Sequence, residues 1–153
     1  MRPKTRPESI QEAVLHHMPR HAERHPRPVA VLTVDDQAVF RKAARDVIDA
    51  TPGFETVGEA ASGEEALALV ASKAPELVLM DIRMPEMDGL ETARRICRSD
   101  PAPVIVLVSA EDDDVLTERL ESAGAAAFVR KQELCPSRLR ALWTAHGAAA
   151  GAV

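Results

Sequence analysis

The chain has 153 residues, of which 46% are hydrophobic and only 3% aromatic, so it suits one domain with a core of aliphatic side chains. Its net charge of −5 is uneven: residues 1–28 hold six Lys or Arg against three Glu, and the rest holds 13 basic against 21 acidic residues. An acidic globular part argues against nucleic acid as the main ligand, and no apolar stretch approaches the roughly 18 residues of a membrane span.

Residues 1–28 are a separate segment that we predict to be largely disordered, because five prolines break any long helix. The sequence also allows a short helix over residues 8–18, and Met18 is an alternative start of the chain. Three histidines would line one helical face and could bind a metal: His17, His21 and His25. Since Pro19 interrupts that helix, a polar tail without a metal is the preferred interpretation.

From residue 29 onward, apolar runs alternate with amphipathic segments. Strands are predicted at 29–34, 54–60, 76–80, 103–108 and 126–129. Helices are predicted at 37–50, 63–72, 88–98, 111–122 and 136–145. Strands that are apolar throughout are typical of a parallel sheet buried on both faces. Five such units predict an α/β fold with an open, doubly wound parallel sheet over residues 29–146, followed by a flexible Ala/Gly tail at 147–153.

Local signals support several of these helices. Ser62 and Glu65 have the spacing of a capping box at the start of the second helix. The first helix has one apolar face, made of Phe40, Ala44, Val47 and Ile48. Two cysteines, Cys97 and Cys135, occur without a CxxC motif or a secretory signal, which favours a reduced, cytoplasmic protein.

Polar side chains follow four of the strands, at the edge where parallel strands end and α/β sheets bind ligands. They are Asp35 and Asp36 after the first strand, Asp81 after the third, Ser109 after the fourth and Lys131 after the fifth. Taken alone, each has a commoner explanation as a helix cap, a turn residue or a solvated charge. Their convergence on one edge favours a functional site.

The chemistry of this set is specific. Three neighbouring carboxylates repel one another unless a cation lies among them, and their hard oxygen atoms suit Mg²⁺. A carboxylate can also act as a nucleophile toward phosphorus, and phosphoryl transfer mainly needs positioning and charge neutralisation. Mg²⁺, the Lys131 ammonium and the Ser109 hydroxyl can supply both. The residues therefore predict a site that carries a phosphoryl group on an aspartate.

Over residues 29–146 the chain resembles the receiver domain of two-component response regulators (CheY-like, with a flavodoxin-like fold). The resemblance rests on Asp35-Asp36, on VLMDIRMPEMDG (78–89), on VSA (108–110) and on FVRK (128–131). It implies the strand order 2-1-3-4-5, which the chemotaxis receiver CheY exemplifies.

The resemblance also implies roles for individual residues. Asp81 matches the phospho-acceptor, and Lys131 and Ser109 match its catalytic partners. The implied Mg²⁺ ligands are Asp36, Asp81, the main-chain carbonyl of Arg83 and, through water, Asp35. Ser109 and Phe128 match the switch pair, and Pro85 and Gly89 match the loop and helix start of the acceptor block. Gln132 stands where the family commonly has a cis proline, as in the branch that lacks it.

Two further side chains bear on the lifetime of the phosphorylated form. Arg83 and Glu111 flank the acceptor and hydroxyl positions, where the family tunes the access of water. An Arg–Glu pair there would shield the phosphoryl group, so our hypothesis is a long-lived phosphorylated form.

The function expected from this resemblance is a phosphorylation-dependent switch in a two-component phosphorelay. A sensor histidine kinase or phosphotransfer protein would phosphorylate it. The fourth helix, fifth strand and fifth helix would then contact an unknown downstream protein or form a homodimer. Only ten residues follow Trp143, so we expect a stand-alone receiver without an output domain. We expect no specific DNA binding, no membrane contact and no catalysis beyond its own phosphorylation and dephosphorylation.

Three alternatives are less favoured. A phosphorylation-independent binding module would not need the complete set of acids, hydroxyl and lysine. A haloacid-dehalogenase-type phosphatase needs a second aspartate two residues after the nucleophile, where this chain has Arg83. A DNA-binding regulator conflicts with the acidity and the length, although the basic N-terminal segment leaves room for weak non-specific contact.

Overall fold

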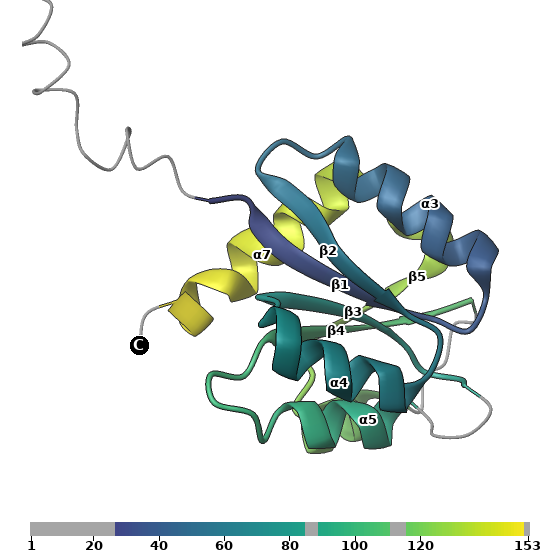
Figure 1. Ribbon diagram of the computed structural model, residues 1–153, viewed down its shortest axis with the longest axis vertical. Helices are drawn as coiled ribbons and strands as arrows, with labels where there is room; N and C mark the ends of the chain where they lie inside the picture. The colour runs from purple at the N-terminus through teal and green to yellow at the C-terminus, as the bar shows by residue number, and fades with distance from the viewer. Residues whose placement is uncertain (1–26, 85–88, 111–115, 152–153) are drawn as a thin grey trace, which may run out of the picture.

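The computed structural model describes residues 27–84, 89–110 and 116–151 (Figure 1). The strands are β1 (Val29–Val34), β2 (Phe54–Ala60), β3 (Leu77–Asp81), β4 (Val104–Ser109) and β5 (Ala127–Arg130). The helices are α3 (Ala38–Asp49), α4 (Gly63–Lys73), α5 (Gly89–Ile96), α6 (Leu116–Ala123) and α7 (Pro136–Gly151), and a 3₁₀ turn, Lys131–Glu133, follows β5. All five predicted strands and all five predicted helices are confirmed where the structure describes them, with most ends within a few residues of the prediction. Residues 111–115 of the fourth predicted helix and residue 88 of the third lie outside the described residues.

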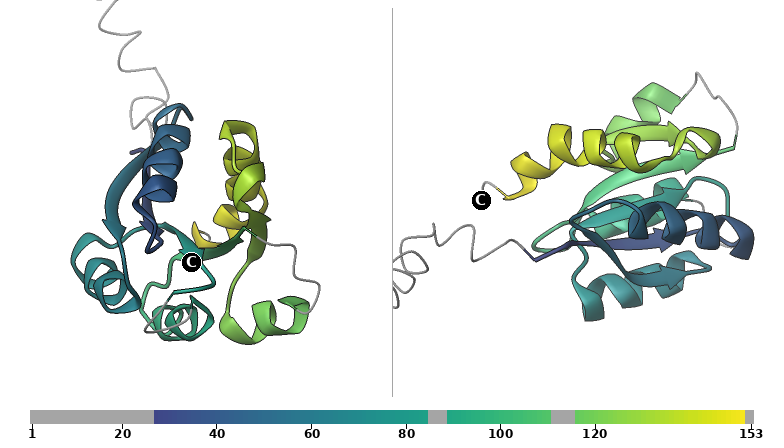
Figure 2. Two further views of the ribbon diagram at one scale, coloured as in Figure 1. Left: turned by 90° about the vertical axis from the view of Figure 1, so that its right-hand side faces the viewer. Right: turned by 90° about the horizontal axis from the view of Figure 1, so that it is seen from above.

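The strands form one parallel sheet in the order β2-β1-β3-β4-β5, as predicted. Helices α3 and α7 cover one face, and α4, α5 and α6 cover the other (Figure 2). The register places Asp81 beside Val108, and Ser109 beside Arg130. The carboxyl ends of β3, β4 and β5 therefore lie together at one edge of the sheet.

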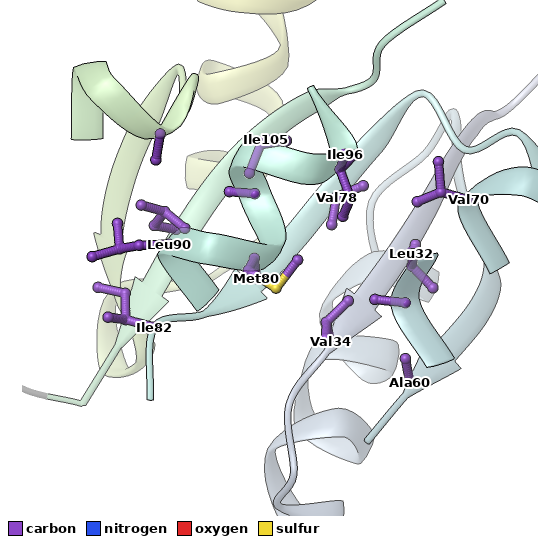
Figure 3. Close-up of a cluster of buried hydrophobic side chains, with 14 of the residues drawn as sticks. Leu32, Val34, Ala60, Val70, Val78, Met80, Ile82, Leu90, Ile96 and Ile105 are labelled. Carbon is purple, nitrogen blue, oxygen red and sulfur yellow. The ribbon is translucent and has the colours of Figure 1, made fainter. Parts of the chain in front are cut away.

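The sheet is buried on both faces, which explains its uninterrupted apolar strands. Successive residues of β3 alternate between two core clusters: Val78 and Met80 face α4 and α5, whereas Leu77 and Leu79 face α3 and α7. Figure 3 shows the first cluster, which Leu32, Ile105 and other aliphatic side chains complete. The low aromatic content thus gives a core of closely packed Val, Leu and Ile side chains.

The predicted signals in the first two helices are confirmed. In α3, Ala44 and Ile48 are buried, with Phe40 and Val47 partly buried against the same cluster. At the start of α4, the Ser62 hydroxyl accepts a hydrogen bond from the Glu65 N–H at 3.2 Å. The Glu65 carboxylate in turn accepts from the N–H of Ala61, one residue before the cap. The first of these bonds satisfies an N–H group that a helix start leaves unpaired, and the second ties the preceding residue to the helix.

The last helix extends beyond its predicted end at residue 145. Residues 147–151 continue α7, where a flexible tail was predicted, and residues 152–153 lie outside the described part of the chain. Alanine is the best helix former, and the run of alanines outweighs the cost of Gly147. Gly147 also has a packing reason: a Cβ there would lie 2.4 Å from atoms of the Trp143 ring.

Three predictions concern the N-terminal segment, of which the structure describes only residues 27 and 28. The helix over 8–18, the three histidines and Met18 lie outside the described residues. Among the helices that the structure describes, none is both long and apolar enough to cross a bilayer.

Candidate functional site

The five predicted site residues lie together at the carboxyl edge of the sheet. A pocket of about 200 Å³ is lined there by Asp36, Gln37, Asp81, Arg83, Ser109, Ala110 and Lys131. Asp35 lies directly behind it, in contact with Lys131. Side chains from four strand ends that are up to 96 residues apart in the sequence thus meet at one position.

Three carboxylates form the acidic part of the site. Asp35, Asp36 and Asp81 each offer an oxygen atom within 4.8 Å of the others. Asp35 is fully buried and Asp81 is 5% exposed, whereas Asp36 faces solvent. Two buried carboxylates this close to a third repel one another, because little water is present to screen them. The site therefore favours the entry of a positive charge.

The Asp35 carboxylate is only partly satisfied. Its Oδ1 atom accepts a hydrogen bond from the Gln37 N–H at 2.8 Å. Its Oδ2 atom is buried and, among the described residues, accepts no well-aligned hydrogen bond. The Lys131 ammonium lies 2.6 Å from Oδ2, so that contact is a close ion pair with poor hydrogen-bond alignment. The oxygen remains suited to a further cationic or hydrogen-bonding partner.

The environment of Asp81 raises its pKa to about 6. Burial is the largest cause, since it penalises the charged form, and the neighbouring charge of Asp35 adds to it. Lys131 opposes this shift, with its Nζ atom 3.9 Å from Asp81 Oδ1. The backbone N–H of Arg83 opposes it too, donating to the same oxygen at 3.4 Å. A nearby cation would therefore stabilise the charged form of Asp81.

These residues fit a divalent cation such as Mg²⁺. The set offers hard oxygen atoms, and the exposed Asp36 leaves one side open to water. One of these oxygens, Asp35 Oδ2, is buried and, within the described part of the chain, accepts no well-aligned hydrogen bond. Arg83 lines the same pocket, and its main-chain carbonyl remains a predicted ligand. The donor chemistry and the clustering are those of a site for a hydrated, oxygen-liganded ion.

Helix α3 fixes the main chain of Asp35, a role that sequence reasoning missed. Arg41 Nη1 donates a hydrogen bond to the Asp35 carbonyl at 2.7 Å. Both Arg41 and Arg45 pair with Glu59 of β2, which holds the arginines against the sheet. The available signal was the spacing of the two arginines by four residues, which places them on one helical face.

The start of α5 lies against the backbone of Asp81. A Cβ on Gly89 would stand 2.0 Å from the Asp81 carbonyl oxygen, so this position admits only glycine without a backbone shift. The Gly89 N–H donates to the Ile82 carbonyl at 2.8 Å, which closes the loop after β3. Pro85, predicted within that loop, lies outside the described residues.

The predicted switch residues share one face of the sheet. Ser109 ends β4 with 4% of its surface exposed. Phe128 is the register partner of Leu107, two residues before Ser109, and packs partly buried against the cluster under α4, α5 and α6. Glu111, predicted to tune the site, lies outside the described residues.

A second contact missed by sequence reasoning involves Lys131. Its ammonium lies 4.7 Å from the centre of the Phe40 ring, and its side chain is only 15% exposed. Phe40 was predicted as a core residue of α3, and the apolar face of that helix gave no sign of this contact.

Comparison with known proteins identifies a family and several relatives. The family model described as the response regulator receiver domain matches residues 31–142. A protein-glutamate methylesterase/protein-glutamine glutaminase of Alkalilimnicola ehrlichii is 40% identical over 106 residues, which is 68% of this chain and 27% of that protein. The response regulator GacA of Pseudomonas aeruginosa is 37% identical over 103 residues, or 67% of this chain and 48% of that protein. The chain therefore spans less than half the length of these relatives.

Solved structures agree with this match. The response regulator domain of Thermotoga maritima CheB has a TM-score of 0.70 at 29% identity, covering 78% of this chain and 96% of that one. The receiver domain of the putative regulator NarL from Mycobacterium tuberculosis has a TM-score of 0.68 at 30% identity, covering 76% and 98%. The matched region contains every described residue of the acidic pocket.

Proposed function

Because the chain belongs to the response regulator receiver domain family, we propose that it is a phosphorylation-dependent switch that accepts a phosphoryl group on Asp81. The observation that carries this proposal is the position of Asp81. Its carboxylate ends a buried strand, lines a pocket, and lies close to two further carboxylates and to the Lys131 ammonium. A sensor histidine kinase or a phosphotransfer protein is the proposed phosphodonor.

In the reaction, an Asp81 oxygen attacks the phosphorus atom of the donor. A new O–P bond forms, the bond between phosphorus and the donor breaks, and the donor keeps the electron pair of that bond. Asp35, Asp36, Asp81 and the Arg83 carbonyl would hold Mg²⁺, which when bound supplies positive charge to the phosphoryl oxygens and to the acidic cluster. Lys131 and Ser109 then contribute an ammonium and a hydroxyl to the same oxygens from β5 and β4.

The phosphoryl group adds a charge of about −2 to an edge already rich in carboxylates. We propose that Ser109 turns toward it and that Phe128, on the same face of the sheet, moves into the space behind Ser109. Helices α6 and α7 flank β5, so this rearrangement would alter the α6–β5–α7 face. That face is the proposed contact surface for a downstream protein or for a second copy of the chain.

The lifetime of the phosphorylated form depends on the access of water. Arg83 is exposed and lines the pocket, so its side chain is placed to cover the phosphoryl group. With Glu111, which follows β4 after one residue, we propose that it slows hydrolysis. We expect the half-life of the phosphorylated form to be shorter in the double variant Arg83→Ala, Glu111→Ala. An unchanged half-life would contradict this part of the proposal.

A switch of this kind, unlike a phosphatase, does not act on outside substrates. The position two residues after Asp81 holds Arg83, and a guanidinium cannot serve there as the general acid of a phosphatase. We therefore propose that its chemistry is limited to its own phosphorylation and dephosphorylation. We propose that this occurs in the cytoplasm, where histidine kinases present their phosphoryl groups.

The test is phosphorylation of the full chain by acetyl phosphate, followed by intact mass. The wild type should gain the mass of one phosphoryl group with Mg²⁺ and none with EDTA. Asp81→Asn should gain none, and Lys131→Met should react much more slowly. Asp46→Asn is the matched control, since Asp46 is an exposed aspartate of α3 paired with Lys42. Equal labelling of Asp81→Asn and the wild type would overturn the assignment.

A further inference from the structure

Among the described residues, the Lys131 ammonium has three partners, and the proposed reaction changes two of them. Two are carboxylates: Asp35 Oδ2 at 2.6 Å and Asp81 Oδ1 at 3.9 Å. The third is the face of the Phe40 ring, whose centre lies 4.7 Å from Nζ. A cation at this distance from a ring face is attracted by the ring quadrupole.

The two carboxylates are the groups that the proposed function uses for other purposes. A divalent ion in the acidic cluster would partly neutralise Asp35, through water, and a phosphoryl group would occupy an oxygen of Asp81. Each step withdraws negative charge from Lys131. The Phe40 ring carries no oxygen ligand, so neither the metal nor the phosphoryl group competes for it.

Phe40 is also anchored by packing against the core. It is the third residue of α3 and packs partly buried against the cluster that contains Ala44, Ile48 and Val129. The same first turns of α3 carry Arg41, whose hydrogen bond fixes the Asp35 main chain. The ring therefore belongs to the helix whose first turns also hold the Asp35 main chain.

We propose that Phe40 is a positioning residue for phosphoryl transfer. Its ring face would hold the Lys131 ammonium beside Asp81 when a divalent ion neutralises the acidic cluster. This inference rests on the proposed function of Asp81. It adds that an aromatic side chain outside the acidic pocket sets the rate at which the lysine reaches the transferred group.

The experiment compares the wild type with Phe40→Leu and Phe40→Tyr. Leucine keeps an apolar side chain in the core but removes the ring, whereas tyrosine keeps the ring. With acetyl phosphate and saturating Mg²⁺, Phe40→Leu should lower the maximal labelling rate about threefold to thirtyfold, the range of one cation–π contact. The concentration of acetyl phosphate at half-maximal rate should change little. Phe40→Tyr should restore most of the rate.

A Lys131→Met background separates positioning from a general effect on the core. There the ammonium is absent, so Phe40→Leu should have no further effect on the slow residual rate. A loss of the same size in both backgrounds would overturn the proposal, because it would show that Phe40 acts through packing alone. Wild-type labelling of Phe40→Leu would also overturn it, while leaving the assignment of Asp81 intact.

A measurement on the wild type observes the contact itself. In proton–carbon NMR spectra, the Lys131 Cε protons should be shifted upfield by the ring current of Phe40. The shift should persist when Mg²⁺ is added and should be retained in Phe40→Tyr. Its disappearance on adding Mg²⁺ would overturn the proposal, since the ring would then release the lysine at the step where its support is needed.

Discussion

Replacing Asp81 by asparagine should stabilise the metal-free protein, although it removes the proposed acceptor. Burial and the charge of Asp35 raise the pKa of Asp81 from 3.8 to about 6. The folded protein therefore binds this proton more tightly than the unfolded chain does. Stability contributed by the protonated form is present below about pH 4 and is lost as the pH rises to about 6. Above about pH 6, the charged Asp81 side chain lowers the free energy of unfolding by a constant amount.

The penalty can be estimated from the pKa difference. One pKa unit corresponds to about 1.4 kcal/mol, so a rise from 3.8 to about 6 gives at most about 3 kcal/mol at pH 8. Because the Asp81 side chain is only 7% exposed, solvent screens this penalty little. Asparagine stays neutral at every pH. Asp81→Asn should therefore raise the free energy of unfolding by about 1–3 kcal/mol at pH 8 and leave it nearly unchanged at pH 4.

Urea denaturation of the full chain in EDTA, at pH 4 and pH 8, measures the difference. Asp46→Asn serves as the control, because an exposed ion pair contributes little at either pH. Saturating Mg²⁺ at pH 8 should stabilise the wild type more than Asp81→Asn and so narrow the gap. A variant that is destabilised at pH 8, or stabilised equally at both pH values, would refute this reading of the acidic cluster.

Three further substitutions test how the fold supports the site. Gly89→Ala should cost about 1–3 kcal/mol in urea denaturation and slow phosphorylation, because its Cβ would meet the acceptor's carbonyl oxygen at 2.0 Å. Gly58→Ala, where the nearest side-chain atom is 3.4 Å away, should change neither measurement greatly. Arg41→Leu removes the charge-assisted hydrogen bond to the Asp35 carbonyl and should weaken Mg²⁺ binding about tenfold in calorimetry. Arg45→Leu removes only the ion pair with Glu59 and should leave Mg²⁺ binding unchanged. Thr33→Val should raise the free energy of unfolding by about 1 kcal/mol. The reason is that the Thr33 hydroxyl is buried and, within the described residues, has no hydrogen-bond partner. A lower stability of Thr33→Val would show that the hydroxyl does form a hydrogen bond.

The sheet can be predicted from the sequence because a strand that is buried on both faces consists of an uninterrupted run of apolar residues. A run such as Leu77–Met80, short and apolar throughout, predicts a strand covered on both faces, and a row of such strands implies a parallel sheet. The site follows from topology, since the polar residue after each strand must lie at the same edge. Asp35, Asp81, Ser109 and Lys131 could therefore be placed together before any coordinates were known.

Contacts between separate elements could not be predicted in this way. The pairing of Arg41 with the Asp35 carbonyl depends on the rotation of α3 over the sheet, which the apolar face fixes only to within about one residue. The contact of Lys131 with Phe40 depends on a rotamer, and the close approach of Gly89 to Asp81 depends on the path of the loop after β3. At the end of α7, alanine propensity outweighed a glycine that reads as a stop signal.

The most direct test of the central claim is to locate the phosphoryl group itself. Borohydride reduces an acyl phosphate to an alcohol, so acetyl phosphate treatment followed by reduction should convert the modified aspartate to homoserine. Peptide mass spectrometry should find homoserine at position 81 when Mg²⁺ is present and at no position when EDTA replaces it. Homoserine at another aspartate, or its formation at position 81 without a divalent ion, would contradict the account.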